Sequence, residues 1–138
     1  MLYKKDDMAA YAASHSLAHK PGTIFNYSSG NSNILSRIIR QTVGEKDYAA
    51  FPFNELFFRI GMYHTLFEPD ASGTYVGSSY INATARDYAR FGLLYYNDGV
   101  WNEERILPVG WVKQTQTSLQ ANPYKNYGYQ FWLNGFDK

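Results

Sequence analysis

The chain has 138 residues, of which 45% are apolar and 18% aromatic. Thirteen lysines and arginines nearly balance twelve aspartates and glutamates, and there is no cysteine. These values predict a single domain over residues 1–138 and exclude a disordered chain, a disulfide scaffold and a thiolate metal site. The basic residues form no cluster, so we expect no nucleic-acid partner. No apolar run approaches the ~20 residues of a membrane span.

The first predicted helix begins at a cap on Asp6 or Asp7 and runs to about Ala18, where a Pro-Gly pair would break it. His15 and His19 lie four residues apart on this helix, the spacing of paired metal ligands. No third ligand accompanies them, and two surface histidines are the more common case. We therefore expect no metal.

A second helix is predicted over Asn31–Val43, with Gly44 as its C-terminal stop. Its apolar residues recur at helical spacing and form one stripe. They are Ile34, Leu35, Ile38, Ile39 and Val43. A third helix is predicted over Asp47–Ile60, in which Pro52 either sits in the first turns or breaks the helix.

The pattern changes to loops and at most one hairpin over Met62–Ala83. Glu68 and Asp70 flank a proline there, and such a carboxylate pair is usually solvated. Thr84 stands three residues before Asp87, which is the spacing of a capping box at the start of a fourth helix. An Asn-Asp-Gly turn ends that helix.

Two very short strands are predicted around the polar turn of residues 100–108, and a last helix starts at Pro108. Tyr127–Asn134 alternates and is aromatic, which predicts a strand. No partner strand is close to it in sequence, and a lone strand leaves its backbone polar groups unpaired. We therefore expect part of the fold to lie outside the chain, and a fold that is mainly α with short β pieces.

Turn formers and hydroxyl groups crowd the stretch Pro21–Asn33, which holds Tyr27 at its middle. A tyrosine hydroxyl has a pKa of about 10, so it acts as a base near neutral pH only beside cations or within a proton relay. No nearby lysine or arginine is certain to serve. From the residues alone, packing is the more frequent role for one of 13 tyrosines.

Two ordered blocks resemble the serine β-lactamase-like family. The block "PGTIFNYSSGNSNILSRIIRQ", residues 21–41, is similar to the family's Pro-Gly-Thr and Tyr-Ser-Asn block, with Tyr27 at the motif tyrosine, Ser28 at its middle position and Ser29 where asparagine is usual. Residues 67–112 look like the corresponding later segment. The resemblance covers about residues 8 to 134. The family contains class C β-lactamases, D-alanyl-D-alanine carboxypeptidases and 6-aminohexanoate-dimer hydrolases. The chain most resembles the last of these, in which Tyr-Ser-Ser occurs.

In such proteins a Ser-x-x-Lys motif supplies a nucleophilic serine that forms an acyl-enzyme, and the motif tyrosine shares its protons. A Lys-Thr-Gly or His-x-Gly motif seats the substrate. No serine of this chain has lysine three residues later, and there is no Lys-Thr-Gly or Lys-Ser-Gly. The resemblance therefore implies the helical subdomain of the β-lactamase/transpeptidase-like α+β fold, an internal fragment that lacks most of the antiparallel sheet.

By this resemblance Tyr27 is the proton-relay residue, and Ser28 and Ser29 position it. The hydroxyl-rich loop Ser78, Ser79 and Tyr80 is expected near the substrate cleft, although a glycine-bent connector is the more common role of such a loop. Two hypotheses stay open: part of a hydrolase of amide, ester or β-lactam bonds, inactive by itself, and a non-catalytic helical module that binds a ligand or partner.

The resemblance implies no cofactor, and it fits the bacterial cytoplasm and the periplasm equally. The expected partners are the remainder of a parent hydrolase and its small substrate. A helix face that would pack on the missing sheet is expected to be exposed and to favour self-association.

Overall fold

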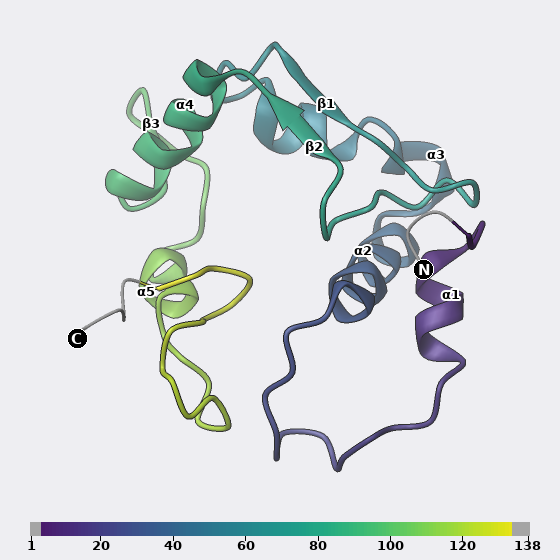
Figure 1. The fold of residues 1–138 in the computed structure, drawn as a ribbon. Coiled ribbons are helices and arrows are strands. Elements are labelled where there is room, and N and C mark those ends of the chain that lie inside the picture. The colour runs from purple at the N-terminus through teal and green to yellow at the C-terminus, as the bar shows by residue number, and fades with distance from the viewer. Residues whose placement is uncertain (1–3, 134–138) are drawn as a thin grey trace. The chain divides into compact units, whose positions relative to one another are not determined.

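The computed structural model describes residues 4–133, which are mostly helical with two small two-stranded sheets (Figure 1). Among these residues, 4–16 and 27–91 form one unit, and 17–26 and 92–133 form a second. Among the described residues, none of the helices combines the length and the apolar composition of a membrane span. The α-helices are α1 (Met8–Ala13), α2 (Ser29–Val43), α3 (Glu45–Tyr48), α4 (Ala85–Tyr96) and α5 (Trp111–Thr115).

Helix α1 begins where the sequence predicts. The Asp7 side chain accepts a hydrogen bond from the Ala10 N–H at 2.8 Å. The helix ends at Ala13 and not near Ala18, because the Ser14 hydroxyl turns back to the Tyr11 carbonyl at 2.8 Å and offers the backbone a local alternative. His15 and His19 therefore lie beyond the helix and not on one of its faces.

Helix α2 buries a polar side. Asn33 and Ser36 are its buried residues, and the Asn33 amide nitrogen lies 3.8 Å from the Met8 sulfur. Leu35, Ile38 and Ile39, which belong to the predicted apolar stripe, are 45–50% exposed. The predicted stop is confirmed: Gly44 is the C-cap with φ 88°, a conformation that favours glycine.

The predicted third helix is interrupted. Helix α3 covers only Glu45–Tyr48, and a π-helical turn follows over Phe53–Phe57, in which the Phe58 N–H donates to the Phe53 carbonyl at 2.8 Å. Pro52, which immediately precedes this turn, has no N–H to donate and so cannot continue the regular ladder.

The core of the first unit is aromatic. Tyr48, Phe57 and Tyr75 are buried, and the Phe67 ring stacks on Tyr75 with a centroid distance of 4.4 Å. The Tyr48 hydroxyl accepts from the Tyr75 N–H at 2.9 Å, and the Tyr75 hydroxyl donates to the Ala49 carbonyl at 2.6 Å. Burial raises the pKa of both tyrosines, so they are neutral donors and acceptors in this core.

The expected hairpin is present in the segment after the π-helical turn. Strand β1 (Thr65–Phe67) pairs antiparallel with β2 (Ile81–Ala83), and Leu66 faces Asn82 in the register. A bridge between Pro69 and Tyr75 closes a smaller loop inside the hairpin connection. The connection therefore forms a closed loop within the first unit.

Helix α4 starts at the predicted capping pair. The Asp87 N–H donates to the Thr84 hydroxyl oxygen at 3.2 Å, and the Thr84 hydroxyl donates to the Asp87 carboxylate at 2.9 Å. Asp87 is fully buried, and it also accepts from the His64 N–H and from Arg90. Burial raises the pKa of Asp87, but the hydrogen bonds from Thr84 and His64 and the charge of Arg90 together hold it below its ordinary value.

In the second unit, β3 (Val100–Trp101) and β4 (Glu104–Arg105) pair antiparallel around a two-residue turn. Asn102 and Glu103 have φ of 46° and 67°, the backbone of the tight hairpin turn that fits the strand twist. The two short strands are therefore confirmed. Helix α5 starts at Trp111, whose N–H donates to the Pro108 carbonyl at 3.0 Å.

The predicted strand over Tyr127–Asn134 is wrong for the described residues. Tyr127 and Trp132 instead form an antiparallel bridge, and the Gly128 N–H donates to the Phe131 carbonyl at 2.9 Å across a turn. Gln130 supplies this turn with φ 63°. The segment pairs with itself, so the argument from a partnerless strand does not hold. Asn134 lies outside the described residues.

Candidate functional site

Tyr27 lies immediately before α2. The next residue, Ser28, is the N-cap: its backbone is extended, and its side-chain oxygen accepts a hydrogen bond from the Gly30 N–H at 3.2 Å. Tyr27 is 58% exposed, so its ring is not sealed in the core. Ser29 is the first residue of the helix and is half-buried. The N-terminus of a helix carries a partial positive charge that favours nearby negative charge.

Helix α1 fixes the start of α2. A Cβ on Gly30 would lie 3.2 Å from the Ala12 Cβ and 3.3 Å from the Ser28 hydroxyl oxygen, which is closer than most real contacts. The absence of a side chain at Gly30 therefore lets α1 pack against the first turn of α2. This packing fixes the first turn of α2, and with it the Ser28 cap and the backbone next to Tyr27.

The loop before β2 lies along α2. A Cβ on Gly77 would be 2.3 Å from the Ser36 hydroxyl oxygen and 3.8 Å from the Ser32 carbonyl oxygen. Ser32 is one helical turn, about 6 Å, from Ser28. The loop that carries Ser78–Tyr80 thus passes one to two turns from the N-cap of α2.

The loop hydroxyls are accessible to different degrees. Ser79 is exposed, and Ser78 and Tyr80 are half-buried. The Ser79 hydroxyl donates to the Ser78 hydroxyl at 3.4 Å, and the Tyr80 N–H donates to the Val76 carbonyl at 3.1 Å. The backbone is therefore ordered by its own turn, while the hydroxyl groups stay near the surface.

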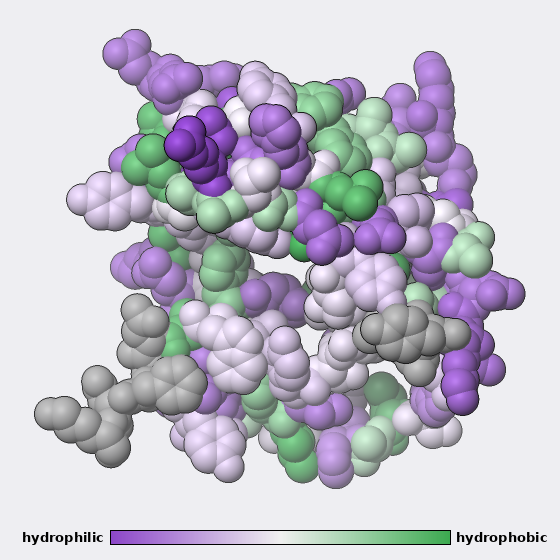
Figure 2. All heavy atoms as spheres, turned by 45° about the horizontal axis from the view of Figure 1, so that its top comes forward, coloured by the Kyte–Doolittle hydropathy of each residue, from purple (hydrophilic) through white to green (hydrophobic). Residues whose placement is uncertain are grey.

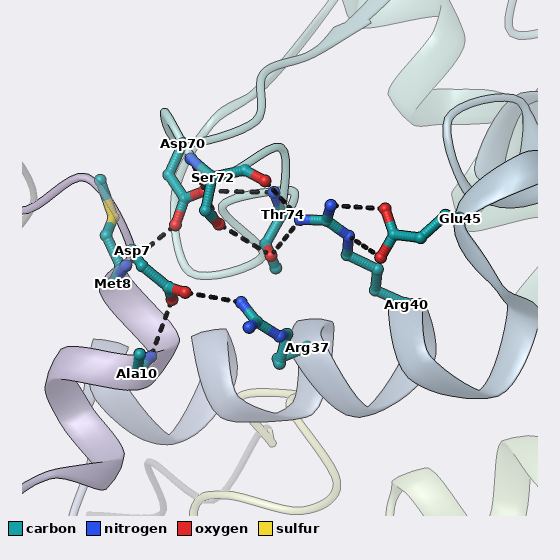
Figure 3. A network of polar contacts seen from close by, with 9 residues as sticks. All are labelled: Asp7, Met8, Ala10, Arg37, Arg40, Glu45, Asp70, Ser72 and Thr74. Carbon is teal, nitrogen blue, oxygen red and sulfur yellow. Dashed lines mark hydrogen bonds and ion pairs between the residues drawn. The ribbon is translucent and has the colours of Figure 1, made fainter.

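A buried carboxylate fixes the base of this loop (Figure 3). Asp70 is 9% exposed and accepts from the Met8 N–H at 2.9 Å, across 62 residues of sequence. Its second oxygen accepts from the Ser72 N–H, the Ser72 hydroxyl and the Thr74 N–H at 2.6–3.1 Å. Asp70 thereby joins the loop to the start of α1. The expectation of a solvated carboxylate is wrong for Asp70, whereas Glu68 is exposed.

Two arginines of α2 extend the same network. Arg40 donates to the Ser72 carbonyl and to the Thr74 hydroxyl, and pairs with Glu45 at the end of the helix (Figure 3). Arg37 donates to Asp7 at 2.7 Å. The Ala10 N–H lowers the pKa of Asp7, burial opposes this, and Arg37 lowers it further, so the pKa lies below that of a free aspartate.

The sequence alone does not predict that Asp70 and Arg40 anchor the loop to α1 and α2. One local signal was present: Asp70 stands two residues before Ser72 and four before Thr74, the pattern in which a carboxylate accepts from the backbone of its own turn. The longer contact with Met8 has no local signal, because it depends on how α1 folds back. No group of three metal-binding side chains occurs in the described part of the chain.

The family model named Beta-lactamase matches residues 1–137. No curated protein matches the sequence at a significant level. A crystal structure from Bacteroides dorei, of a protein named as a candidate beta-lactamase, superposes with a TM-score of 0.73 and 21% sequence identity. The match covers 94% of this chain and 45% of that chain, so the present sequence spans under half of that structure. At this identity the structural likeness shows the fold, here a mainly helical part of it.

The match of the family model covers nearly the whole chain and agrees with the resemblance of the two sequence blocks. The mostly helical architecture with two short sheets agrees with a partial β-lactamase-like fold. The chain belongs to the beta-lactamase family.

Proposed function

We propose that this chain is part of a serine hydrolase that cleaves amide, ester or β-lactam bonds through an acyl-enzyme, with Tyr27 as its proton-relay residue. The observation that carries the proposal is the place of Tyr27: an exposed phenol directly before the N-cap of α2, in a chain whose family match spans residues 1–137. A proton-transfer group has to come within hydrogen-bond reach of the reacting atoms, and an exposed ring leaves Tyr27 open to such a contact.

The proposed chemistry requires one proton path. The serine oxygen attacks the carbonyl carbon, and its proton passes through the Tyr27 oxygen to the leaving nitrogen or oxygen as that bond breaks. Water then attacks the acyl-enzyme and returns a proton to the serine. The positive end of α2 stabilises negative charge that develops near its first turn. Ser28, as the N-cap, and Ser29, as the first residue of α2, position the backbone of Tyr27.

The serine and lysine of this scheme come from another part of the protein, because the chain has no Ser-x-x-Lys. Ser78, Ser79 and Tyr80 contribute surface hydroxyls that can contact the substrate. Their loop passes along α2 within two turns of the cap. The chain alone is therefore proposed to be inactive.

The substrate is proposed to be a small linear amide or ester. The triplet Tyr27–Ser28–Ser29 resembles the Tyr-Ser-Ser of the 6-aminohexanoate-dimer hydrolase branch. Its third residue is a serine, where β-lactamases usually have asparagine. A serine hydroxyl is shorter than an asparagine amide and has one donor where the amide has two. The third position of the triplet can therefore make fewer contacts to a bicyclic lactam.

Covalent labelling tests the division of the site. The folded chain is incubated with a fluorophosphonate and, separately, with a fluorescent penicillin, and intact mass is measured beside an active serine hydrolase as positive control. We expect no adduct on this chain and an adduct on the control. An adduct mapped to a serine of this chain would overturn the divided site. A parent gene without Ser-x-x-Lys would instead favour the non-catalytic binding module.

A further inference from the structure

The segment Leu17–Asn26, which belongs to the second unit, leads directly into Tyr27. The structure describes all of this segment, and its residues lie outside any helix or strand. The Thr23 N–H donates to the Lys20 carbonyl at 3.2 Å and closes a turn. Tyr27 itself precedes the N-cap of α2, so the regular hydrogen bonds of the helix do not fix its backbone. The conformation of Tyr27 therefore depends on what holds the chain before it as well as on the Ser28 cap.

Phe25 is the one residue of this segment that is covered. It is half-buried, whereas the rest of the segment is exposed, including Leu17 at 76% and Ile24 at 56%. Apolar side chains often reach the surface of this chain: Figure 2 shows hydrophobic residues, in green, beside hydrophilic ones, in purple. Hydrophobicity alone does not separate Phe25 from its neighbour Ile24, so a specific contact covers the Phe25 ring.

That contact is with Tyr127. The two ring centroids lie 5.5 Å apart with 46° between the ring planes, which is within the range of favourable aromatic pairs. Tyr127 is 7% exposed, and the Trp132 ring meets it edge-on at 5.2 Å. All three residues belong to the second unit. The contact is thus complete within this chain and needs no residue from the remainder of the hydrolase.

A tight turn fixes the backbone of Tyr127 to the end of α5. The Tyr129 N–H donates at 3.2 Å to the carbonyl of Thr115, the last residue of α5. A Cβ on Gly128 would lie 2.1 Å from the same carbonyl oxygen, so the close approach of the turn requires glycine. Thr115 is buried, with 1% exposed. Phe25 therefore packs on a ring whose own backbone is held against a buried helix end.

We infer that Phe25 is a positioning residue for Tyr27, an inference that rests on the proposed relay role of Tyr27. Phe25 lies two residues before Tyr27, and the Ser28 cap directly follows it. The ring contact and the helix cap therefore hold the chain on both sides of the phenol. Two residues span at most about 7 Å, so a movement of Phe25 leaves little backbone to absorb it before Tyr27. A misplacement of about 1 Å can slow a catalysed step about 100-fold.

Backbone order in the chain itself tests the contact independently of catalysis. Nitrogen-15 relaxation gives the order parameters of the Asn26 and Tyr27 amides, which are about 0.85 in a rigid backbone and below about 0.6 in a flexible one. We expect rigid values in the wild type and values below about 0.6 in Phe25→Ala. Ile24→Ala is the matched control, because Ile24 is exposed, and it should keep the wild-type values. Order parameters that stay at the wild-type level in Phe25→Ala would overturn the inference.

Single-turnover acylation of the protein that joins this chain to its Ser-x-x-Lys segment tests the consequence for catalysis. We expect Phe25→Ala to slow acylation about 10–100-fold with substrate affinity unchanged. Phe25→Leu keeps an apolar group against Tyr127 and should recover most of this loss. In a Tyr27→Phe background, Phe25→Ala should add at most about a twofold loss, because the hydroxyl group that it misplaces is already absent. Circular dichroism confirms folding, and Tyr127→Leu disrupts the same contact from its other side if Phe25→Ala is unfolded.

The two possible failures are distinguishable. If Phe25→Ala causes an equal loss in the wild-type and Tyr27→Phe backgrounds, Phe25 acts through another group, and the inference fails while the relay role of Tyr27 stands. The same conclusion follows if Phe25→Ala acylates as fast as the wild type. If Tyr27→Phe itself leaves acylation unchanged, the proposed relay is refuted, and this inference is refuted with it.

Discussion

Replacing Asp70 tests the anchor of the hydroxyl-rich loop. The carboxylate is 9% exposed and accepts four hydrogen bonds, from the Met8 N–H, the Ser72 N–H, the Ser72 hydroxyl and the Thr74 N–H. Asp70→Ala removes every acceptor. Asp70→Asn keeps the oxygen that serves Ser72 and Thr74, and replaces only the one that faces Met8.

The structure gives the size of each effect. In Asp70→Ala, the N–H groups of Met8 and Thr74 lose their partner in a buried setting, since these residues are 4% and 1% exposed. An unsatisfied buried donor costs about 1–3 kcal/mol, so the variant should lose about 4 kcal/mol of unfolding free energy. Asp70→Asn leaves one donor facing another and should lose about 1–3 kcal/mol.

Urea unfolding followed by far-UV circular dichroism measures these losses, with Glu68→Ala as the control. Glu68 lies on the other side of the same proline but is exposed, so its removal should change the free energy of unfolding by less than about 0.5 kcal/mol. Hydrogen exchange should show faster exchange at the Met8 and Thr74 amides in Asp70→Ala. If Asp70→Ala is as stable as Glu68→Ala to within about 1 kcal/mol, the loop is held by other contacts and the reasoning fails.

Two further variants probe close packing and a buried charge. Gly77→Ala places a Cβ 2.3 Å from the Ser36 hydroxyl oxygen and should lower the free energy of unfolding by about 1–3 kcal/mol. Adding Ser36→Ala removes that oxygen and should recover most of this loss. A double variant whose loss equals the summed losses of the two single variants would contradict the contact. Asp87 has a lowered pKa in the fold, so its stabilisation is present above the unfolded value of about 3.9 and is lost as the pH falls through the folded value. Thermal melts should therefore show that acidification below about pH 4 destabilises the wild type more than Asp87→Asn, and equal losses would refute this.

Local signals predicted much of the fold. Asp7 as a cap, Gly44 as a stop and the Thr84–Asp87 pair each depend on contacts within a few residues, and all three are confirmed. The turn at Asn102 and Glu103 belongs to the same class. Such contacts are specified by neighbouring side chains, so a single sequence is enough to find them.

Features that depend on distant residues were missed. The depth of Asp70 depends on Met8, 62 residues earlier, and the buried side of α2 depends on contacts such as that of Asn33 with Met8. Periodicity marks the apolar stripe of α2 but does not say which side faces the core. The alternating aromatic residues of this segment predict a strand, but Gln130 adopts a φ of 63° and turns the chain there. Residue types do not indicate this backbone conformation.

The candidate site divides in the same way. The position of Tyr27 before a helix follows from the turn formers and from the Ser28 cap. The approach of the Ser78–Tyr80 loop to α2 follows from Gly77 beside Ser36, a contact across 41 residues that no local pattern indicates. The proton-relay role of Tyr27 rests on the resemblance to the β-lactamase family, because no local pattern of residues indicates it.

The central claim is that Tyr27 transfers the proton of a serine supplied by another part of the protein. Single-turnover acylation of the protein that joins this chain to its Ser-x-x-Lys segment tests it most directly, with Tyr27→Phe compared with Tyr63→Phe, an equally conservative change at a residue that is 68% exposed. We predict that Tyr27→Phe slows acylation by about 10²–10⁴-fold with substrate affinity unchanged, while Tyr63→Phe acylates like the wild type. Acylation by Tyr27→Phe within about tenfold of the wild type would contradict the claim.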